Sequence, residues 1–121
     1  MKAVGIPVAL ASDNCRDAFH PYGDYDLLEV LRETMRTGHL DLDAMDWLAS
    51  ISTTPAACMG AKMGGVLEAG GPADFILFKA RSISELFARP QADRIVVRSG
   101  KRLIDPLPAF SELDSVFDQG C

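Results

Sequence analysis

Residues 5–12 read GIPVALAS, and this stretch decides the fold class of the chain. It is almost continuously apolar and lacks the polar alternation of a half-exposed strand, which predicts a strand covered on both faces, as in a parallel sheet. Asp13 stands at the carboxyl end of this predicted strand. Because ligands of α/β proteins bind beyond the carboxyl ends of strands, Asp13 is the foremost candidate for a functional side chain, with loop bracing as its alternative role.

Outward from this strand, the sequence predicts a long loop and then a helix. Residues 13–26 read DNCRDAFHPYGDYD, a mixture of Asp, Asn, Pro and Gly that is typical of an irregular loop. From about Asp26 the apolar residues recur on one helical face, Asp24 or Asp26 is available as the cap, and Gly38 ends the pattern. Residues 5–37 are therefore expected to form a strand, a loop and a helix.

The rest of the chain predicts short helices and short strands. The patterns favour further helices over residues 43–50, 55–60 and 82–88. They favour strands over residues 73–78, 95–97 and 103–104. The sequence VVRSGKRLI predicts a hairpin that turns at Ser99 and Gly100, and its basic neighbours, Arg94 among them, are expected on the solvent side. The tail is expected to be irregular apart from one helical turn near residues 111–117.

The composition of the chain bounds its function classes. It has 121 residues, of which 48% are hydrophobic and 24% charged, and this is ordinary for one globular domain or two small pieces. The net charge of −5 argues against a protein that binds nucleic acid by neutralising phosphates. The apolar run over residues 3–11 is far shorter than the roughly 20 residues of a membrane span, so no membrane partner is expected.

Cysteines, histidines and glycines point to no self-contained site. Cys15, Cys58 and Cys121 are widely spaced without a CxxC pair, which predicts neither a disulfide framework nor a zinc knuckle and fits a reducing cytoplasm. His20 and His39 form no metal-ligand pair, although His20 stands in the loop after the predicted strand. The glycine clusters contain no phosphate-binding motif.

Four segments of the chain, taken in order, resemble the C-terminal portion of the amidohydrolase superfamily. The first, GIPVALASDNCRDAFHPYGDYDLLEVLR at residues 5–32, resembles the eighth barrel strand of the cytosine deaminase branch with its aspartate, loop and helix. TTPAACMG at residues 53–60 resembles the helix that follows. GGPADFILF at residues 70–78 resembles the strand that returns to the small β-sandwich, and VVRSGKRLI at residues 96–104 resembles the closing hairpin.

The resemblance implies an α/β fold, with the last strand and helices of a metal-dependent hydrolase (β/α)8 barrel and part of a small β-sandwich domain. Residues 1–63 would be the C-terminal part of the barrel, and residues 64–121 the C-terminal part of the β-sandwich domain with the tail. The charge divides in the same way, −4 in the first part and −1 in the second. Since such a barrel typically has about 250 residues, most of it is expected outside the chain.

The resemblance also implies a function, the hydrolytic deamination of an amino-substituted nitrogen heterocycle. Asp13 matches the aspartate that contacts the catalytic metal and receives the proton of the attacking water. Asn14 matches a pocket position that influences the choice of substrate. Phe19 matches an aromatic position that lines the base-binding pocket, where we expect Trp, and this departure leaves rings other than cytosine open as substrates.

The implied cofactor is a divalent metal, zinc or iron, with most of its ligands outside this chain. We therefore expect the chain to be inactive by itself and to need two partners, the missing N-terminal part of the barrel and a small heterocyclic substrate. A homo-oligomer in the cytoplasm is expected. Two alternatives stay open: a non-catalytic structural or oligomerisation module, and an amidohydrolase that acts on a triazine, hydantoin-like or dihydropyrimidine ring.

Overall fold

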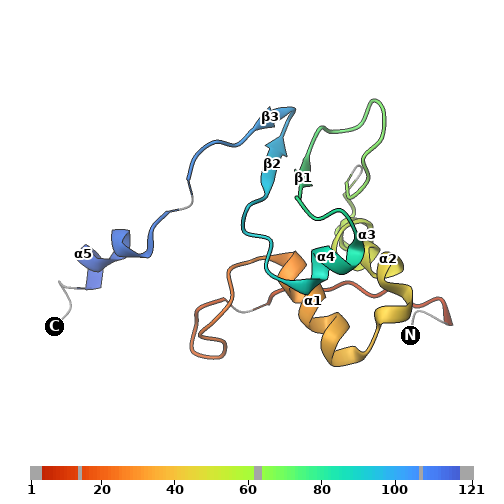
Figure 1. The fold of residues 1–121 in the computed structure, drawn as a ribbon, viewed down its shortest axis with the longest axis horizontal. Coiled ribbons are helices and arrows are strands. Elements are labelled where there is room, and N and C mark those ends of the chain that lie inside the picture. The colour runs from red at the N-terminus through yellow and green to blue at the C-terminus, as the bar shows by residue number, and fades with distance from the viewer. Residues whose placement is uncertain (1–3, 14, 62–63, 107, 118–121) are drawn as a thin grey trace.

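The computed structural model describes residues 4–13, 15–61, 64–106 and 108–117, which form a group of short helices beside a small antiparallel sheet (Figure 1). The helices are α1 (Leu27–Gly38), α2 (Ala44–Trp47), α3 (Thr53–Cys58), α4 (Ile83–Ala88) and α5 (Asp114–Phe117). The described part also holds the 3-10 helices η2 (Asp41–Asp43), η3 (Leu48–Ile51) and η4 (Phe110–Leu113). The sheet has the spatial order β1 (Phe75–Leu77), β2 (Ile95–Arg98), β3 (Lys101–Arg102). In Figure 1, α1 to α4 gather together, the strands rise from them, and the chain after β3 extends to α5 at the far side.

Helix α1 forms where the sequence predicts it because Asp26 caps its first turn. The backbone of Asp26 is extended, and its carboxylate accepts hydrogen bonds from the backbone N–H groups of Leu28 at 3.0 Å and Glu29 at 3.4 Å. These donors have no partner inside the helix, so the cap satisfies them. At the other end His39 adopts a left-handed conformation, and its backbone N–H donates to the carbonyl of Met35. The predicted capped helix is confirmed.

The predicted hairpin is confirmed as well. Strands β2 and β3 pair antiparallel with Val97 opposite Arg102, and β1 pairs with the other edge of β2 with Phe75 opposite Val97. The two turn residues, Ser99 and Gly100, have φ angles of 49° and 74°. Positive φ at both positions is what a tight two-residue hairpin turn requires, because it matches the twist of the strands. The third strand covers Lys101–Arg102, so the strand predicted over residues 103–104 is displaced by two residues towards the turn.

The other predicted helices form with changed boundaries. The segment predicted as one helix over residues 43–50 divides into α2 and η3. Helix α3 begins at Thr53, so Pro55 is its third residue rather than its first. Proline at this position removes no hydrogen bond of the helix, because the first four N–H groups of a helix have no partner within it. Helix α4 begins at Ile83, one residue later than predicted, because Ser82 is its cap: the hydroxyl of Ser82 accepts from the N–H of Glu85 at 3.1 Å.

The strand predicted over residues 5–12 is not formed in the structure. Residues 6–12 have no regular secondary structure. Their backbone is tied to the helices by one hydrogen bond, from the N–H of Leu10 to the carbonyl of Ser50 at 2.8 Å. A strand exists only as part of a ladder, and none of the described segments runs beside residues 6–12 as a paired strand. The apolar character of residues 5–12 is therefore not sufficient to form a strand.

The buried core of the described residues is small. Leu31 and Met35, on one face of α1, are its buried hydrophobic side chains, with exposed fractions of 0% and 2%. Large apolar side chains of the sheet and of the chain after it stay exposed, namely Ile76, Leu77, Leu103 and Ile104. A core of this size contributes little stability, because the hydrophobic effect scales with the apolar area removed from water. Among the described residues, none of the helices has the length and apolar character that crossing a bilayer requires.

We predict that Gly65→Ala lowers the thermal unfolding midpoint far more than Gly70→Ala. Both glycines have positive φ, but a Cβ on Gly65 would meet the backbone between Ser52 and Thr53 at 2.5 Å, whereas nothing lies within 4 Å of one on Gly70. Left-handed alanine costs about 1–2 kcal/mol at either position, and the backbone conflict adds to this only at Gly65. Far-UV circular dichroism during heating measures the difference, and equal midpoints would contradict the packing of Gly65 on α3.

Candidate functional site

Asp13 ends the apolar segment and begins the loop that leads to α1. Its side chain is exposed, and its backbone has a φ of 57°, in the left-handed region. Non-glycine residues adopt this region at an energetic cost, and Asp and Asn adopt it more readily than most. The segment before Asp13 is held by the hydrogen bond from the N–H of Leu10 to the carbonyl of Ser50. The carboxylate is thus presented to solvent at the start of the loop.

The loop after Asp13 is held together by its own hydrogen bonds. The backbone N–H of Arg16 donates to the carbonyl of Tyr22 at 3.3 Å, and that of Asp17 donates to the carbonyl of His20 at 3.1 Å. The Asp17 carboxylate accepts from the N–H groups of Phe19 and His20, both at 2.9 Å. Asp side chains stabilise tight turns in this way. The predicted irregular loop is confirmed, since its described residues form neither helix nor strand, and local hydrogen bonds hold its backbone.

The tip of this loop presents aromatic side chains to solvent. Phe19 is 88% exposed. The rings of His20 and Tyr22 contact edge to face with centroids 6.1 Å apart, a favoured geometry for aromatic pairs. The flat faces of exposed rings are available for stacking.

A hollow of about 710 Å³ lies between the segment before Asp13, the loop and α1. The four carboxyl groups in its wall are those of Asp24, Asp26, Glu29 and Glu33. Each is paired with an arginine: Arg16 with Asp24, Arg94 with Asp26, Arg32 with both Glu29 and Glu33, and Arg36 also with Glu33. Because all four are engaged in ion pairs, the wall holds no free pair of carboxylates for acid–base chemistry.

The structure does not gather the sequence-predicted site residues into one pocket. Asp13 and Phe19 lie outside the wall of the hollow, although Ser12 and His20 beside them are part of it. Asn14 lies outside the described residues. The roles expected for these three residues therefore stay predictions.

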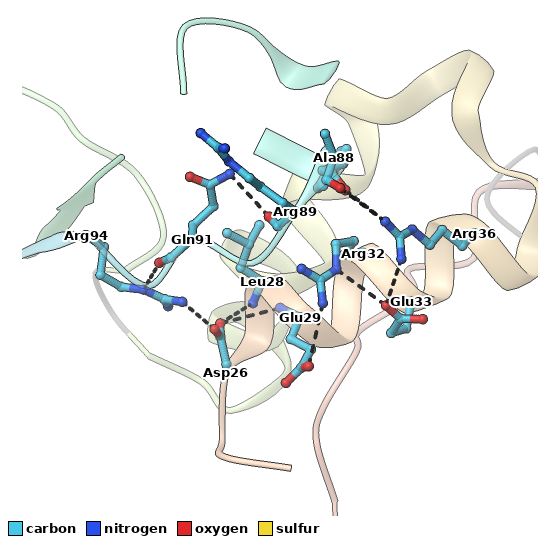
Figure 2. Close-up of polar contacts among 11 residues, drawn as sticks. Asp26, Leu28, Glu29, Arg32, Glu33, Arg36, Ala88, Arg89, Gln91 and Arg94 are labelled. Atoms are coloured by element: carbon cyan, nitrogen blue, oxygen red, sulfur yellow. Dashed lines mark hydrogen bonds and ion pairs between the residues drawn. The ribbon is translucent and has the colours of Figure 1, made fainter. Parts of the chain in front are cut away.

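Asp26 joins the first half of the chain to the second through an ion pair with Arg94 (Figure 2). Both side chains are 23% exposed. Partial burial by itself would raise the pKa of Asp26, but the hydrogen bond and charge of Arg94, with the N–H groups of Leu28 and Glu29, outweigh burial and lower this pKa. The hydrogen bond from Arg94 to Asp26 in turn raises the pKa of Arg94. The cap of α1 is thus also a tertiary contact.

The solvent-side position predicted for Arg94 is wrong. Its Nε donates to the carbonyl of Gln91 at 2.8 Å, and its guanidinium lies over the ring of Phe78 at 5.6 Å from the centroid. The sequence contains no signal for this arrangement, because Asp26 and Arg94 are 68 positions apart. The contact between Arg16 and the ring of Phe110 could not be predicted for the same reason, because the two residues are far apart in the sequence.

The described residues do not provide a complete metal centre. Within residues 4–13, 15–61, 64–106 and 108–117, no group of three or more His, Cys, Asp or Glu side chains could hold a metal ion. Catalytic metal sites need about three protein ligands. Asp13 can contribute one carboxylate, and a complete ligand set needs residues outside the described ones.

Comparison with known proteins identifies the class of protein. The amidohydrolase family matches residues 1–104, and the chain belongs to this family. It is 47% identical over 116 residues to a pterin deaminase of Rhizobium rhizogenes (strain K84 / ATCC BAA-868). The match covers 96% of this chain and 26% of the relative, so the chain spans about a quarter of the length of that enzyme. No solved structure matches the chain.

We predict that Asp26→Asn destabilises the chain near neutral pH and that this difference disappears in acid. Asn still caps a helix but cannot pair with the charge of Arg94, so we expect a loss of about 1–2 kcal/mol. The folded pKa of Asp26 lies below the unfolded value of about 3.9. Its contribution is therefore present above about pH 4 and is lost as the pH falls towards the folded pKa.

Urea unfolding followed by circular dichroism between neutral pH and about pH 3 measures this difference. Asp24→Asn is the matched control, because Asp24 also pairs with an arginine but caps no helix. A difference between wild type and Asp26→Asn that does not change with pH would contradict the assigned ion pair.

Proposed function

We propose that this chain is the segment of a deaminase that hydrolyses an amino group from a planar nitrogen heterocycle, with a pterin favoured over cytosine. The observation that carries the proposal is the 47% identity to a pterin deaminase over 96% of the chain. This match includes the turn at Asp13 and the loop after it. A pterin is an amino-substituted, fused nitrogen ring and belongs to the substrate class that the resemblance implies.

In this proposal Asp13 is the residue that moves a proton. Hydrolytic deamination adds water to the ring carbon that bears the amino group and releases ammonia. A carboxylate beside that carbon can accept the proton of the attacking water and transfer it to the leaving nitrogen. Asp13 suits this role because it is exposed to solvent at the start of the loop that carries Phe19.

Phe19 and Asn14 are the proposed substrate-binding residues. The ring of Phe19 is 88% exposed at the tip of an ordered loop, so a flat substrate can stack on it without displacing a core side chain. A fused two-ring substrate offers more stacking area than a single pyrimidine ring does. The selection between rings by Asn14 is proposed from the family resemblance.

Enzymes of the amidohydrolase family generally use a divalent metal, zinc or iron in this proposal, which lowers the pKa of a bound water. The described residues offer one carboxylate for it. We propose that the other ligands belong to the preceding part of the barrel and that residues 1–63 and 64–121 complete the barrel and the β-sandwich respectively. By itself the chain is then inactive. The complete protein is proposed to be a cytoplasmic homo-oligomer.

A chimera tests the proposal. We predict that replacing the matching segment of the Rhizobium pterin deaminase by this chain leaves an enzyme that releases ammonia from pterin. In that chimera Asp13→Asn lowers kcat about 100-fold or more, because general acid–base catalysis contributes about that much. Ammonia release measures the rate.

The matched control for Asp13→Asn is Asp17→Asn. Asp17 is an aspartate of the same loop that bonds only to backbone N–H groups there. We expect it to change KM more than kcat. An inactive but folded wild-type chimera would favour the alternative of a structural or oligomerisation module, and equal effects of the two substitutions on kcat would remove Asp13 from catalysis.

The ring preference of the chimera is a separate prediction. We expect Phe19→Ala to raise KM for pterin by about tenfold, since base–aromatic stacking contributes about 1–3 kcal/mol. Phe19→Trp, which restores the aromatic residue expected in the cytosine deaminase branch, should retain pterin turnover. Steady-state kinetics with pterin and with cytosine measure this preference as the ratio of the two kcat/KM values. A preference for cytosine would overturn the assignment to pterins.

A further inference from the structure

Two neighbouring side chains close the base of the loop after Asp13. The Sγ of Cys15 donates to the carbonyl of Gly23 at 3.2 Å. The other side chain is that of Arg16. Its Nε donates to the carbonyl of Gly23 at 3.2 Å, and its Nη2 pairs with Oδ1 of Asp24 at 2.8 Å. Its backbone N–H donates to the carbonyl of Tyr22. These bonds join the first residues of the loop to the last, so Arg16 closes the loop at its base and the aromatic tip lies between the joined ends.

The same guanidinium contacts the C-terminal segment of the chain. Its Cζ lies over the ring of Phe110, 4.3 Å from the ring centroid, which is the geometry of a cation–π interaction. Phe110 begins η4, which continues into α5. Arg16 therefore uses the edge of its guanidinium for the loop and the face for the C-terminal segment.

The backbone conformation of Arg16 supports a specific role. Its φ of 54° lies in the left-handed region, which a long side chain such as arginine adopts only at an energetic cost. Such strain persists where the surrounding contacts determine the conformation, and it concentrates at functional sites. The contacts of Arg16 with Gly23, Asp24 and Phe110 meet this condition.

We propose that Arg16 is a positioning residue that fixes the loop carrying Phe19 relative to Asp13 and joins this loop to the C-terminal segment at Phe110. The part of this inference that concerns substrate binding rests on the proposed function. The closure of the loop by Arg16 does not depend on it. Arg16 itself is three residues from Asp13 and is assigned no contact with substrate.

The contacts at position 16 require arginine rather than another positively charged residue. The Arg16–Asp24 ion pair is exposed, with 42% and 65% of the side chains in contact with solvent, and exposed ion pairs contribute little. A planar guanidinium can bond to a carbonyl and a carboxylate along its edge while its face stacks on a ring. A lysine ammonium keeps the charge but cannot make this set of contacts. The variant Arg16→Lys therefore tests whether the planar guanidinium is needed in addition to the positive charge.

Limited chymotrypsin digestion of the 121-residue chain tests the closure of the loop. The protease cuts after Phe19, Tyr22 and Tyr25, and mass spectrometry follows each cut. We expect Arg16→Gln and Arg16→Lys to accelerate these cuts at least about fivefold, because cleavage follows the population of the locally opened state. Phe110→Ala should accelerate them less, since it removes only the stacking contact.

The matched control is Arg81→Gln. Arg81 also forms an exposed ion pair, with Glu85 at 2.7 Å, but it lies just before α4 and outside the loop. Far-UV circular dichroism of each variant establishes that the helices are retained. If chymotrypsin cuts the loop of the Arg16→Gln variant no faster than that of the Arg81→Gln variant, the proposed closure is wrong.

Kinetics of the pterin deaminase chimera test the positioning role. We expect Arg16→Ala to raise KM about tenfold with kcat within about twofold, because a disordered loop weakens substrate binding but leaves the proton transfer intact. Added guanidinium ion should lower this KM again, whereas it should not help Phe19→Ala. An active chimera in which Arg16→Ala leaves KM unchanged would overturn the positioning role.

The two experiments separate failure of this inference from failure of the proposed function. If the unsubstituted chimera is inactive on both pterin and cytosine, the proposed function fails, and the positioning role fails with it. The digestion of the chain itself still decides whether Arg16 closes the loop.

Discussion

The bonds of Asp26 are the constraint on which the arrangement of the described chain depends. One carboxylate caps the first turn of α1 and also pairs with Arg94, which precedes β2 (Figure 2). Capping fixes where α1 begins, and the ion pair fixes where the chain leading into the sheet lies relative to that helix. Because Leu31 and Met35 are the buried hydrophobic side chains of the described residues, polar contacts of this kind carry more of the tertiary structure than they do in a larger domain.

A second group of polar contacts holds α4 in place. The buried amide of Gln91, 6% exposed, donates to the carbonyls of Glu85, Leu86 and Arg89. These bonds satisfy carbonyls at the end of α4, which would otherwise lack partners. From the other side Arg36 of α1 donates to the carbonyls of Phe87 and Ala88, both at 3.5 Å. The C-terminal end of α4 is thus secured by residues both nearby and distant in sequence.

The loop between Asp13 and α1 joins these structural contacts to the proposed chemistry. Its last residues lead directly into the Asp26 cap, so the N-terminus of α1 anchors one end of the loop. The other end begins at the left-handed turn of Asp13. Between them, Arg16 and Asp17 order the backbone. A catalytic carboxylate and a substrate-stacking ring can act together only if the backbone between them is ordered, and this loop meets that requirement.

The local elements could be predicted from the sequence alone: the Asp26 cap with α1, the helix α4, and the turn at Ser99 and Gly100. Caps and tight turns depend on a few neighbouring residues, so their signals are complete within the sequence. The family and the candidate Asp13 were also found there. Only the tertiary structure decided that residues 5–12 stay unpaired and that Arg94 and Arg16 reach Asp26 and Phe110. A strand needs a neighbouring strand and an ion pair needs its partner nearby, and chain folding alone brings such distant residues together.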